Sequence, residues 1–286
     1  MPTDAATTHA TVTGHPVIGF LTDFGLDGAA AICRGVMLAI ARDAQIIDIS
    51  HAVAKYAIRD GAYLLASAVP WLPVGVHVAV VDPGVGTDRR PVGLLTARGD
   101  ILIGPDNGLL IAAAERLGGV IEARLLENPE WLLPGTSATF HGRDIFAPVA
   151  AHLALGAPFE AAGSPVDPAT LVRMHAPAPT VTAGRLDTTV TYVDSFGNLR
   201  LAGDVTDLAE ALGPGGSAAQ LVIELTDSPG LREVHARWLR TFGEASAGEL
   251  LVYEDSSGNL ALAESSGSAA RRLDLASGSR IGIRRV

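Results

Sequence analysis

The sequence predicts an α/β domain followed by a smaller all-β domain. Between residues 15 and 156, apolar runs of strand length alternate with amphipathic helical stretches. This order is typical of a mixed, mostly parallel sheet with helices on both faces. Residues 157–184 are rich in proline and alanine, a composition typical of a linker. Beyond residue 184, short alternating runs are separated by turn residues, which indicates a β-barrel or sandwich.

In the first domain, strand-like and helical patterns follow one another at short intervals. The apolar runs predict strands at 16–22, 45–50, 75–82 and 120–126, and a hairpin whose strands, 91–97 and 101–106, flank a turn at 98–100. Apolar residues at four-residue spacing predict a helix that is capped by Asp27 and runs to about Arg42. Further helices are expected at 58–69, 108–118 and 142–156.

The second domain is expected to consist mainly of short strands. Its alternating runs lie at 185–194, 198–203, 219–225, 249–264 and 279–286, with one short helix at 205–213. We expect no repeat of fixed period. The domains are therefore predicted as 15–175 and 184–286, with residues 1–14 as a flexible tail.

Composition and charge argue against several classes of protein. Of the 286 residues, 48% are hydrophobic and 18% charged, which favours large buried cores over disorder. The net charge of −10 argues against a nucleic-acid partner, because phosphate binding requires a basic surface. No apolar run approaches the roughly 20 residues that span a bilayer. Residues 1–14 do not resemble a signal peptide, and the single cysteine, Cys33, fits a reducing compartment, so we expect a cytoplasmic protein.

Four polar residues follow expected strands: Asp23, His51, Asp82 and Asp106. In open α/β sheets, ligands bind beyond the carboxyl ends of the strands. The sequence therefore predicts a ligand site at this edge of the first domain.

Two segments near this edge carry side chains suited to catalysis. Glycines in the loop 82–89 permit a tight turn that brings Arg89 back to Asp82, although a structural ion pair would explain the same spacing. His141 precedes the last helix of the first domain, where the helix dipole favours a neutral imidazole that can accept a proton. Helix capping by this segment, which includes Asp144, is the alternative explanation.

Two turns and the scattered histidines complete the candidates. The turn at 105–109 is explained either as a structural turn or as a ligand contact. The segment 192–198 ends a strand with an aromatic ring and an amide, the groups that bind a purine, or forms a plain hairpin turn. No H-E-x-x-H, H-x-H or E-x-x-H pattern occurs, so we expect no metal site and no bound cofactor.

Six motifs in one order carry a family resemblance: TDFG (22–25), DISHAV (48–53), VVDPGVGTDRR (80–90), PDNGL (105–109), FHGRDIFAPVAA (140–151) and DSFGN (194–198). Together they closely resemble the S-adenosyl-L-methionine (SAM) hydrolases, or SAM hydroxide adenosyltransferases, which are related to fluorinase and chlorinase. The resemblance extends from about residue 17 to 283. It implies a metal-independent enzyme in which water or hydroxide attacks the ribose C5′ of SAM by nucleophilic substitution, giving adenosine and L-methionine.

The resemblance also assigns roles to residues of this chain. Asp82, Arg89 and His141 would form the catalytic trio, and Asp23 would hold the ribose hydroxyls. The other substrate contacts would be Tyr56 at the sugar, Phe196 and Phe242 on the two faces of the adenine, Asn198 at its edge, and Asp27, Asp194 and Ser256 at the methionine end. The family further implies a homotrimer whose sites lie at subunit interfaces.

Several positions bear on the choice between related activities. The halogenases place other residues at the Asp and His positions of the trio and a serine where this chain has Gly142, which favours oxygen over halide as the nucleophile. The chain departs from its family at Gly28-Ala29-Ala30 and at Arg200-Leu201, where many relatives have Thr-Asn. The alternatives are a halogenase that transfers chloride or fluoride to C5′, and a non-catalytic protein that binds adenosine or SAM.

Two arrangements of the nucleophile remain open at this point. In the first, His141 and Asp82 take the proton of a water molecule as the attack proceeds. In the second, Arg89 stabilises a bound hydroxide electrostatically.

Overall fold

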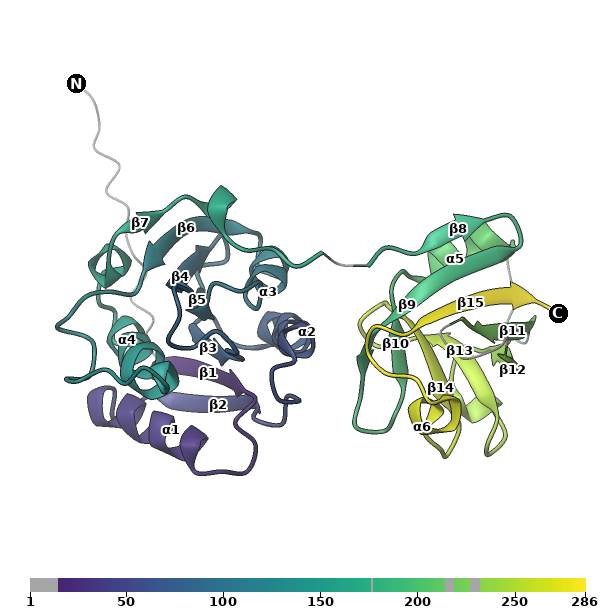
Figure 1. Ribbon diagram of the computed structural model, residues 1–286, viewed down its shortest axis with the longest axis horizontal. Coiled ribbons are helices and arrows are strands. Elements are labelled where there is room, and N and C mark those ends of the chain that lie inside the picture. Colours follow the sequence, from purple (N-terminus) through teal and green to yellow (C-terminus); the bar gives the residue numbers. More distant parts are fainter. Residues whose placement is uncertain (1–14, 176, 214–218, 227–231) are drawn as a thin grey trace, which may run out of the picture. The chain divides into compact units, whose positions relative to one another are not determined.

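The computed structural model describes residues 15–175, 177–213, 219–226 and 232–286. The chain divides into two compact units, Met1–Arg173 and Met174–Val286, each with a sheet and a hydrophobic core of its own (Figure 1). The expected tail, residues 1–14, lies outside the described residues.

The first unit contains a mixed sheet, as the sequence predicts. Within the described residues its strand order is β2-β1-β3-β5-β4-β6-β7. The parallel strands are β2 (Gln45–Ser50), β1 (Val17–Thr22), β3 (Val76–Val80) and β5 (Ile101–Pro105). The antiparallel strands are β4 (Pro91–Thr96), β6 (Val120–Leu125) and β7 (Pro165–Val166).

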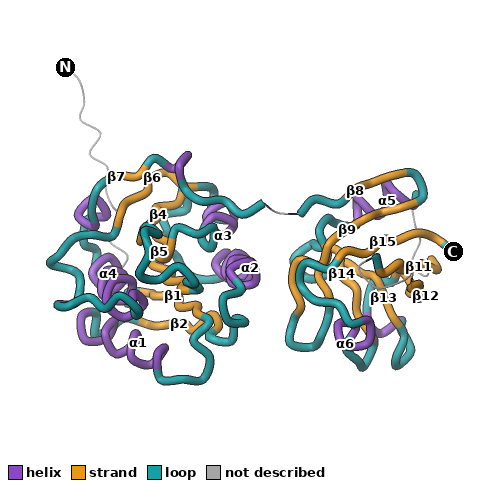
Figure 2. Tube along the Cα trace, viewed as in Figure 1, coloured by secondary structure: helices purple, strands orange, loops and turns teal. Residues whose placement is uncertain are grey.

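Helices cover both faces of this sheet, because alternate residues of each strand point to opposite sides. On one face α1 (Ala29–Ile40) packs against α4 (Ala147–Ala154), and Ile18 and Phe20 of β1 are fully buried in the same core cluster. On the other face α2 (Ile58–Ala68) packs against α3 (Ile111–Arg116) (Figure 2). Gly61 of α2 approaches Leu21 and Val81 closely.

Several boundaries differ from the sequence prediction. The N-cap of α1 is Gly28 and no side chain caps this helix, so the expected capping by Asp27 is wrong. Helix α3 begins only at Ile111, because a turn precedes it. In this turn the Asn107 side chain accepts a hydrogen bond from the backbone N–H of Leu109, and Gly108 adopts a left-handed conformation with φ +93°. The helix expected at 142–156 is a π-helical turn, Gly142–Phe146, followed by α4.

The segment expected to be a linker contains regular structure on both sides of the unit boundary. The 3₁₀ turns Phe159–Ala162 and Pro168–Thr170 and strand β7 belong to the first unit. Strand β8 (Thr180–Thr182) pairs with β9 (Arg185–Val193) in the second unit.

The second unit is a closed barrel, which confirms the prediction of a β-barrel or sandwich. Among the described residues, seven strands follow the order β10-β14-β13-β12-β11-β15-β9, and pairing of β10 with β9 closes the ring. The remaining strands are β10 (Leu199–Leu201), β11 (Ala219–Leu225), β12 (Arg232–Trp238), β13 (Leu250–Glu254), β14 (Leu260–Glu264) and β15 (Arg280–Arg285).

Two short helices accompany the barrel. Helix α5 (Val205–Leu212) agrees with the sequence pattern and begins with a capping box formed by Asp204 and Asp207. Helix α6 (Ala269–Leu273) was not expected, nor were strands β8 and β12. None of the helices in the described ranges has both the length and the apolar character needed to cross a membrane.

Candidate active site

The candidate catalytic side chains meet at one edge of the sheet of the first unit. Strands β1 and β3 are parallel, so Asp23 and Asp82, which follow them, lie at the same edge. Strand β4 is antiparallel to β5 and therefore starts at this edge, which places Arg89 there as well. His141 immediately precedes the π-helical turn.

Asp82, Arg89 and His141 are in direct contact. The Arg89 guanidinium donates from Nε to Asp82 Oδ1 at 3.1 Å and from Nη2 to Asp82 Oδ2, and Nη2 also lies 3.0 Å from His141 Nδ1. Only 7% of the Arg89 side chain and 5% of the Asp82 side chain are exposed. The guanidinium lies over the ring of Phe146, and within the described residues Nη1 is buried without a hydrogen-bond partner.

The contact with Arg89 defines the hydrogen-bonding state of His141. A guanidinium only donates, so Nδ1 must accept, and a neutral ring then carries its proton on Nε2. Burial and the positive charge of Arg89 lower the pKa of His141, while Asp82 and Asp144 oppose this shift. The neutral imidazole that the sequence predicts is therefore favoured, by burial and by Arg89 more than by a helix dipole.

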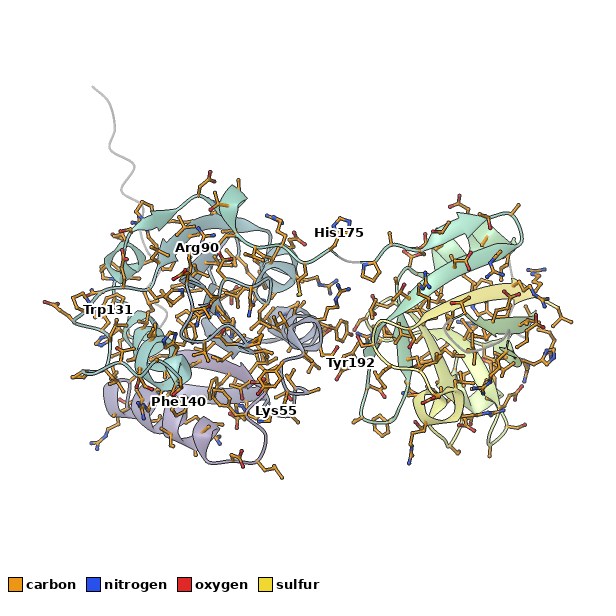
Figure 3. All side chains as sticks on the ribbon, in the orientation of Figure 1. Lys55, Arg90, Trp131, Phe140, His175 and Tyr192 are labelled. Carbon is orange, nitrogen blue, oxygen red and sulfur yellow. The ribbon has the colours of Figure 1, made fainter. Side chains whose placement is uncertain are left out.

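These residues adjoin a cavity of about 180 Å³. Asp23, Asp82 and His141 line it, whereas Arg89 contacts Asp82 and His141 without being part of the lining. Phe24 and Phe140 form an aromatic wall, with ring centroids 5.8 Å apart in an edge-to-face arrangement. Lys55, labelled with Phe140 in Figure 3, also lines the cavity and donates to the Phe24 carbonyl at 3.1 Å.

Tyr56 is held in a strained conformation beside Asp23. Its backbone has φ +67°, in the left-handed region that residues with a side chain rarely adopt. Its N–H donates to Asp23 Oδ2 at 2.9 Å, and its side chain is 69% exposed. Such strain is concentrated at functional sites, which is consistent with the predicted position of Tyr56 at the sugar.

His51 supports the loop after β1 and does not line the cavity. Its Nδ1 lies 2.8 Å from the hydroxyl of Thr22, its Nε2 lies 3.0 Å from Asp48, and its carbonyl accepts from the N–H of Gly25. These contacts fix the backbone on both sides of Asp23.

Gly142 allows the π-helical turn to approach this loop closely. A Cβ at this position would lie 3.0 Å from Cζ of Phe24 and 3.6 Å from Sγ of Cys33. Cys33 is buried, and burial raises the pKa of its thiol to about 12, so the thiol stays protonated. Cys33 is therefore a packing residue below the site.

Asp106 and Asn107 hold the two ends of the loop 82–89. Asn107 Nδ2 donates to the carbonyl of Val81 at 2.9 Å. The backbone N–H of Asp106 donates to the carbonyl of Arg90 at 2.9 Å, and the Asp106 carboxylate accepts from Arg90 Nε at 2.8 Å. Of the two explanations for the turn at 105–109, the structure supports the structural one.

A second cavity, of about 310 Å³, lies in the barrel unit. It gathers four of the predicted substrate contacts, Asp194, Asn198, Phe242 and Ser256, and Phe242 lies edge-on to Tyr253 at 5.0 Å. Both oxygens of Asp194 already accept hydrogen bonds within its own turn. Phe196 and Asp27 are exposed and line neither cavity, so their roles remain predictions.

Several lining residues were not predicted as substrate contacts from the sequence. They are Phe24, Lys55 and Phe140 in the first cavity, and Tyr192, Arg200, Tyr253 and Asp255 in the second. Phe24 and Phe140 fall inside quoted motifs, which was the available signal. In the described residues, no group of three or more His, Cys, Asp or Glu side chains is arranged to hold a metal ion. The metal-independent reaction stays a prediction.

Comparison with known proteins identifies the family of the chain. Residues 18–163 match the SAM hydroxide adenosyltransferase N-terminal domain, and residues 188–282 match the corresponding C-terminal domain. The chain belongs to this family. A protein of Salinispora tropica named (R)-S-adenosyl-L-methionine hydrolase is 46% identical, over 94% of this chain and 97% of its own length.

More distant relatives and solved structures extend the comparison. A fluorinase of an Actinoplanes species is 31% identical over 93% of this chain and 96% of its own. The crystal structure of an uncharacterized conserved protein from Thermotoga maritima superposes with a TM-score of 0.85 at 35% identity, covering 94% of this chain and all of that one. The fold of that protein is therefore present over nearly the whole chain.

Proposed function

We propose that this protein hydrolyses SAM at the ribose C5′, giving adenosine and L-methionine. The observation that carries the proposal is the contact of Asp82, Arg89 and His141 beside a cavity in the first unit. The identity of 46% to a named hydrolase, against 31% to a fluorinase, favours hydrolysis over halogenation. Gly142 adds support, because the halogenases resemble this chain but place a serine there.

The difficult part of the reaction is activation of the nucleophile. The C5′–S bond breaks with its electron pair going to sulfur, and a neutral thioether leaves, so no general acid is required. Forming free hydroxide first, with a carboxylate as the base, is uphill by about 12 pKa units, or roughly 16 kcal/mol. A water molecule that attacks directly becomes more acidic as the C5′–O bond forms, and a carboxylate then suffices to accept its proton.

The contacts within the trio favour Asp82 as the group that takes this proton. His141 Nδ1 already accepts from Arg89, and its Nε2 carries a proton, so the neutral ring has no free lone pair for a base. Its Nε2–H instead donates a hydrogen bond that orients the attacking oxygen. Arg89 orients both partners, and the proton leaves Asp82 for solvent after adenosine has formed.

The remaining contacts and the assembly belong to the same proposal. Asp23 and Tyr56 contact the ribose, and Phe196, Asn198 and Phe242 contact the adenine. Asp27, Asp194 and Ser256 contact the methionine end. The enzyme needs neither metal nor cofactor, is cytoplasmic, and forms a homotrimer with its sites at subunit interfaces, as the resemblance implies.

Incubation with SAM in ¹⁸O-labelled water tests the reaction. We expect methionine release and one ¹⁸O atom in the 5′-hydroxyl of adenosine, detected by mass spectrometry. A parallel incubation with chloride or fluoride should give no halogenated nucleoside. Tight binding without methionine release would identify a binding protein instead, and label in any other product would exclude attack at C5′.

A further inference from the structure

The barrel contains a duplicated segment that the sequence patterns did not predict. Residues 192–202, YVDSFGNLRLA, and residues 253–263, YEDSSGNLALA, are identical at eight of eleven positions. The first copy spans the turn between β9 and β10, and the second spans the turn between β13 and β14. The barrel therefore contains an internal duplication, although two copies do not make a repeat of fixed period.

The two copies form the same turn. In each, one oxygen of the leading aspartate, Asp194 or Asp255, accepts from the backbone N–H groups two and four residues later. The backbone N–H of each aspartate also donates to the carbonyl of the asparagine four residues on. The glycines of the two turns, Gly197 and Gly258, have φ +85° and +80°. The duplication is therefore present in the structure as well as in the sequence.

The two hairpins are related by a local two-fold axis. Strands β10 and β14 pair antiparallel, with Arg200 opposite Ala261, and these two residues occupy the same position in their copies. The leading tyrosine and the aspartate of each copy both line the 310 Å³ cavity: Tyr192 and Asp194 from one hairpin, Tyr253 and Asp255 from the other. The cavity thus has two walls of equivalent construction.

Arg200 breaks this symmetry. Its Nε pairs with Oδ2 of Asp255 on the opposite hairpin at 2.5 Å, whereas Ala261, its counterpart, cannot pair with Asp194. The pairing changes the turn that it reaches. Asn198 Nδ2 lies 2.8 Å from Asp194 Oδ2, but the equivalent Asn259 lies 3.5 Å from Asp255 Oδ2. In the second turn the Arg200 guanidinium, and not the Asn259 amide, is the nearer partner of Asp255 Oδ2.

The ion pair is well shielded, with side chains 18% exposed for Arg200 and 9% for Asp255. A charge-assisted hydrogen bond that is shielded from solvent is strong and restrains the distance between its two partners. The pair therefore joins the turn that carries Asn198 to the turn that carries Ser256 across the cavity.

We propose that Arg200 is a positioning residue for substrate binding, which sets the separation of the two duplicated turns through Asp255. This inference rests on the proposed function only in taking the cavity as the place where the nucleoside binds. Fixed separation holds Asn198 of one turn, proposed to contact the adenine, and Ser256 of the other, proposed to contact the methionine end, at the distance that the substrate requires. The residue acts on affinity and not on the chemical step, because Asp82, Arg89 and His141 all belong to the first unit.

Substitution of Arg200 separates affinity from turnover. For R200A we expect the KM for SAM and the dissociation constant of adenosine to rise about tenfold, the factor that one charged hydrogen bond in a shielded site commonly contributes. The kcat should stay within about twofold of the wild-type value. Because adenosine is neutral, its weaker binding cannot be ascribed to a changed cavity charge. The R200K variant keeps the charge and should recover most of the affinity.

The exchange variant R200A/A261R is the matched control. It preserves composition and net charge. By the local two-fold relation, the arginine at position 261 can reach Asp194, while Asp255 loses its ion-pair partner. We expect it to keep the thermal stability of R200K but to bind adenosine as weakly as R200A. Wild-type affinity in R200A or in the exchange variant would overturn the inference, as would a loss confined to kcat. Calorimetry measures the dissociation constant of adenosine even if the wild-type protein releases no methionine. Absence of methionine release would refute the proposed function but not this inference.

Discussion

The two ring nitrogens of His141 have different surroundings, and this difference governs the expected pH dependence. Nδ1 accepts from Arg89, so protonation at this nitrogen would direct an N–H at a cation. Burial and Arg89 accordingly lower the pKa of His141 from 6.5. The neutral, competent form is therefore retained at neutral pH and is lost only as the pH falls through a value below 6.5.

The pH profile of kcat/KM should show this loss. We expect a plateau at neutral pH and a decline on the acidic side, with a midpoint below the ordinary histidine value of about 6.5. The variant H141N keeps an acceptor near Arg89 but has no titrating ring, so its lower activity should lack the histidine contribution to this decline. An acidic limb with the same midpoint in both proteins would assign the titration to another group.

The trio as a whole is expected to contribute to the transition state more than to binding. The substitutions D82A, R89A and H141A should each reduce turnover at least about a hundredfold, the range typical of groups that transfer protons or stabilise charge. Binding of SAM, measured by calorimetry, should be largely preserved. Wild-type turnover in all three variants would remove the proposed mechanism.

At the scale of elements, the loop 82–89 depends on the neighbouring turn that holds both of its ends. Asn107 Nδ2 donates to Val81 just before Asp82, and its Oδ1 accepts from Leu109. Removing the amide should let Asp82 drift relative to Arg89. For N107A we expect kcat to fall about tenfold and the free energy of unfolding to fall by about 2 kcal/mol, roughly 1 kcal/mol for each of the two hydrogen bonds lost.

Asn128 provides a matched control for this variant. Its Nδ2 donates to the Ala161 carbonyl at 2.8 Å and its Oδ1 accepts from Glu130, the same pattern at a loop away from the cavity. N128A should lose a similar amount of stability with kcat unchanged. Equal activity losses in the two variants would mean that the effect of N107A is general destabilisation.

The sequence predicted those elements whose apolar periodicity is clear and local. Strand β2 and helix α2 agree with their expected ranges to within a residue, and the loop spacing correctly predicted the contact of Asp82 with Arg89. The capping of α1 was predicted wrongly, because Asp27 is a good capping residue by type but the backbone places Gly28 at the cap.

Features set by long-range closure could not be predicted in this way. The pairing of Arg200 with Asp255 depends on β10 and β14 becoming neighbours in the barrel, which no local pattern specifies. Strand β12 alternates charged and apolar residues in REVHARW but has little apolar character overall. The duplication itself is visible in the sequence, because both turns share the pattern Asp-Ser-x-Gly-Asn.

At the scale of the whole molecule, each unit has, among the described residues, a hydrophobic core and a cavity of its own. The first unit supplies the catalytic trio, and the second supplies the residues proposed to bind adenine. The proposed homotrimer joins these halves between subunits: each site takes the trio from one subunit and the adenine contacts from its neighbour.

Two inactive variants should complement each other in mixed trimers. D82A disables the first unit, and the double variant N198A/F242A disables the second, so each homotrimer alone is expected to be inactive. In trimers that assemble at random from equal amounts of the two chains, about a quarter of the sites combine an intact first unit with an intact neighbouring second unit. Tandem purification with two different affinity tags after co-expression removes both homotrimers. Each mixed trimer then has one intact site in three, so the purified protein should show about a third of the wild-type activity per site. If each subunit built its site from its own two units, every site in the mixture would carry one disabled half, and the purified hetero-oligomer would be as inactive as its parents.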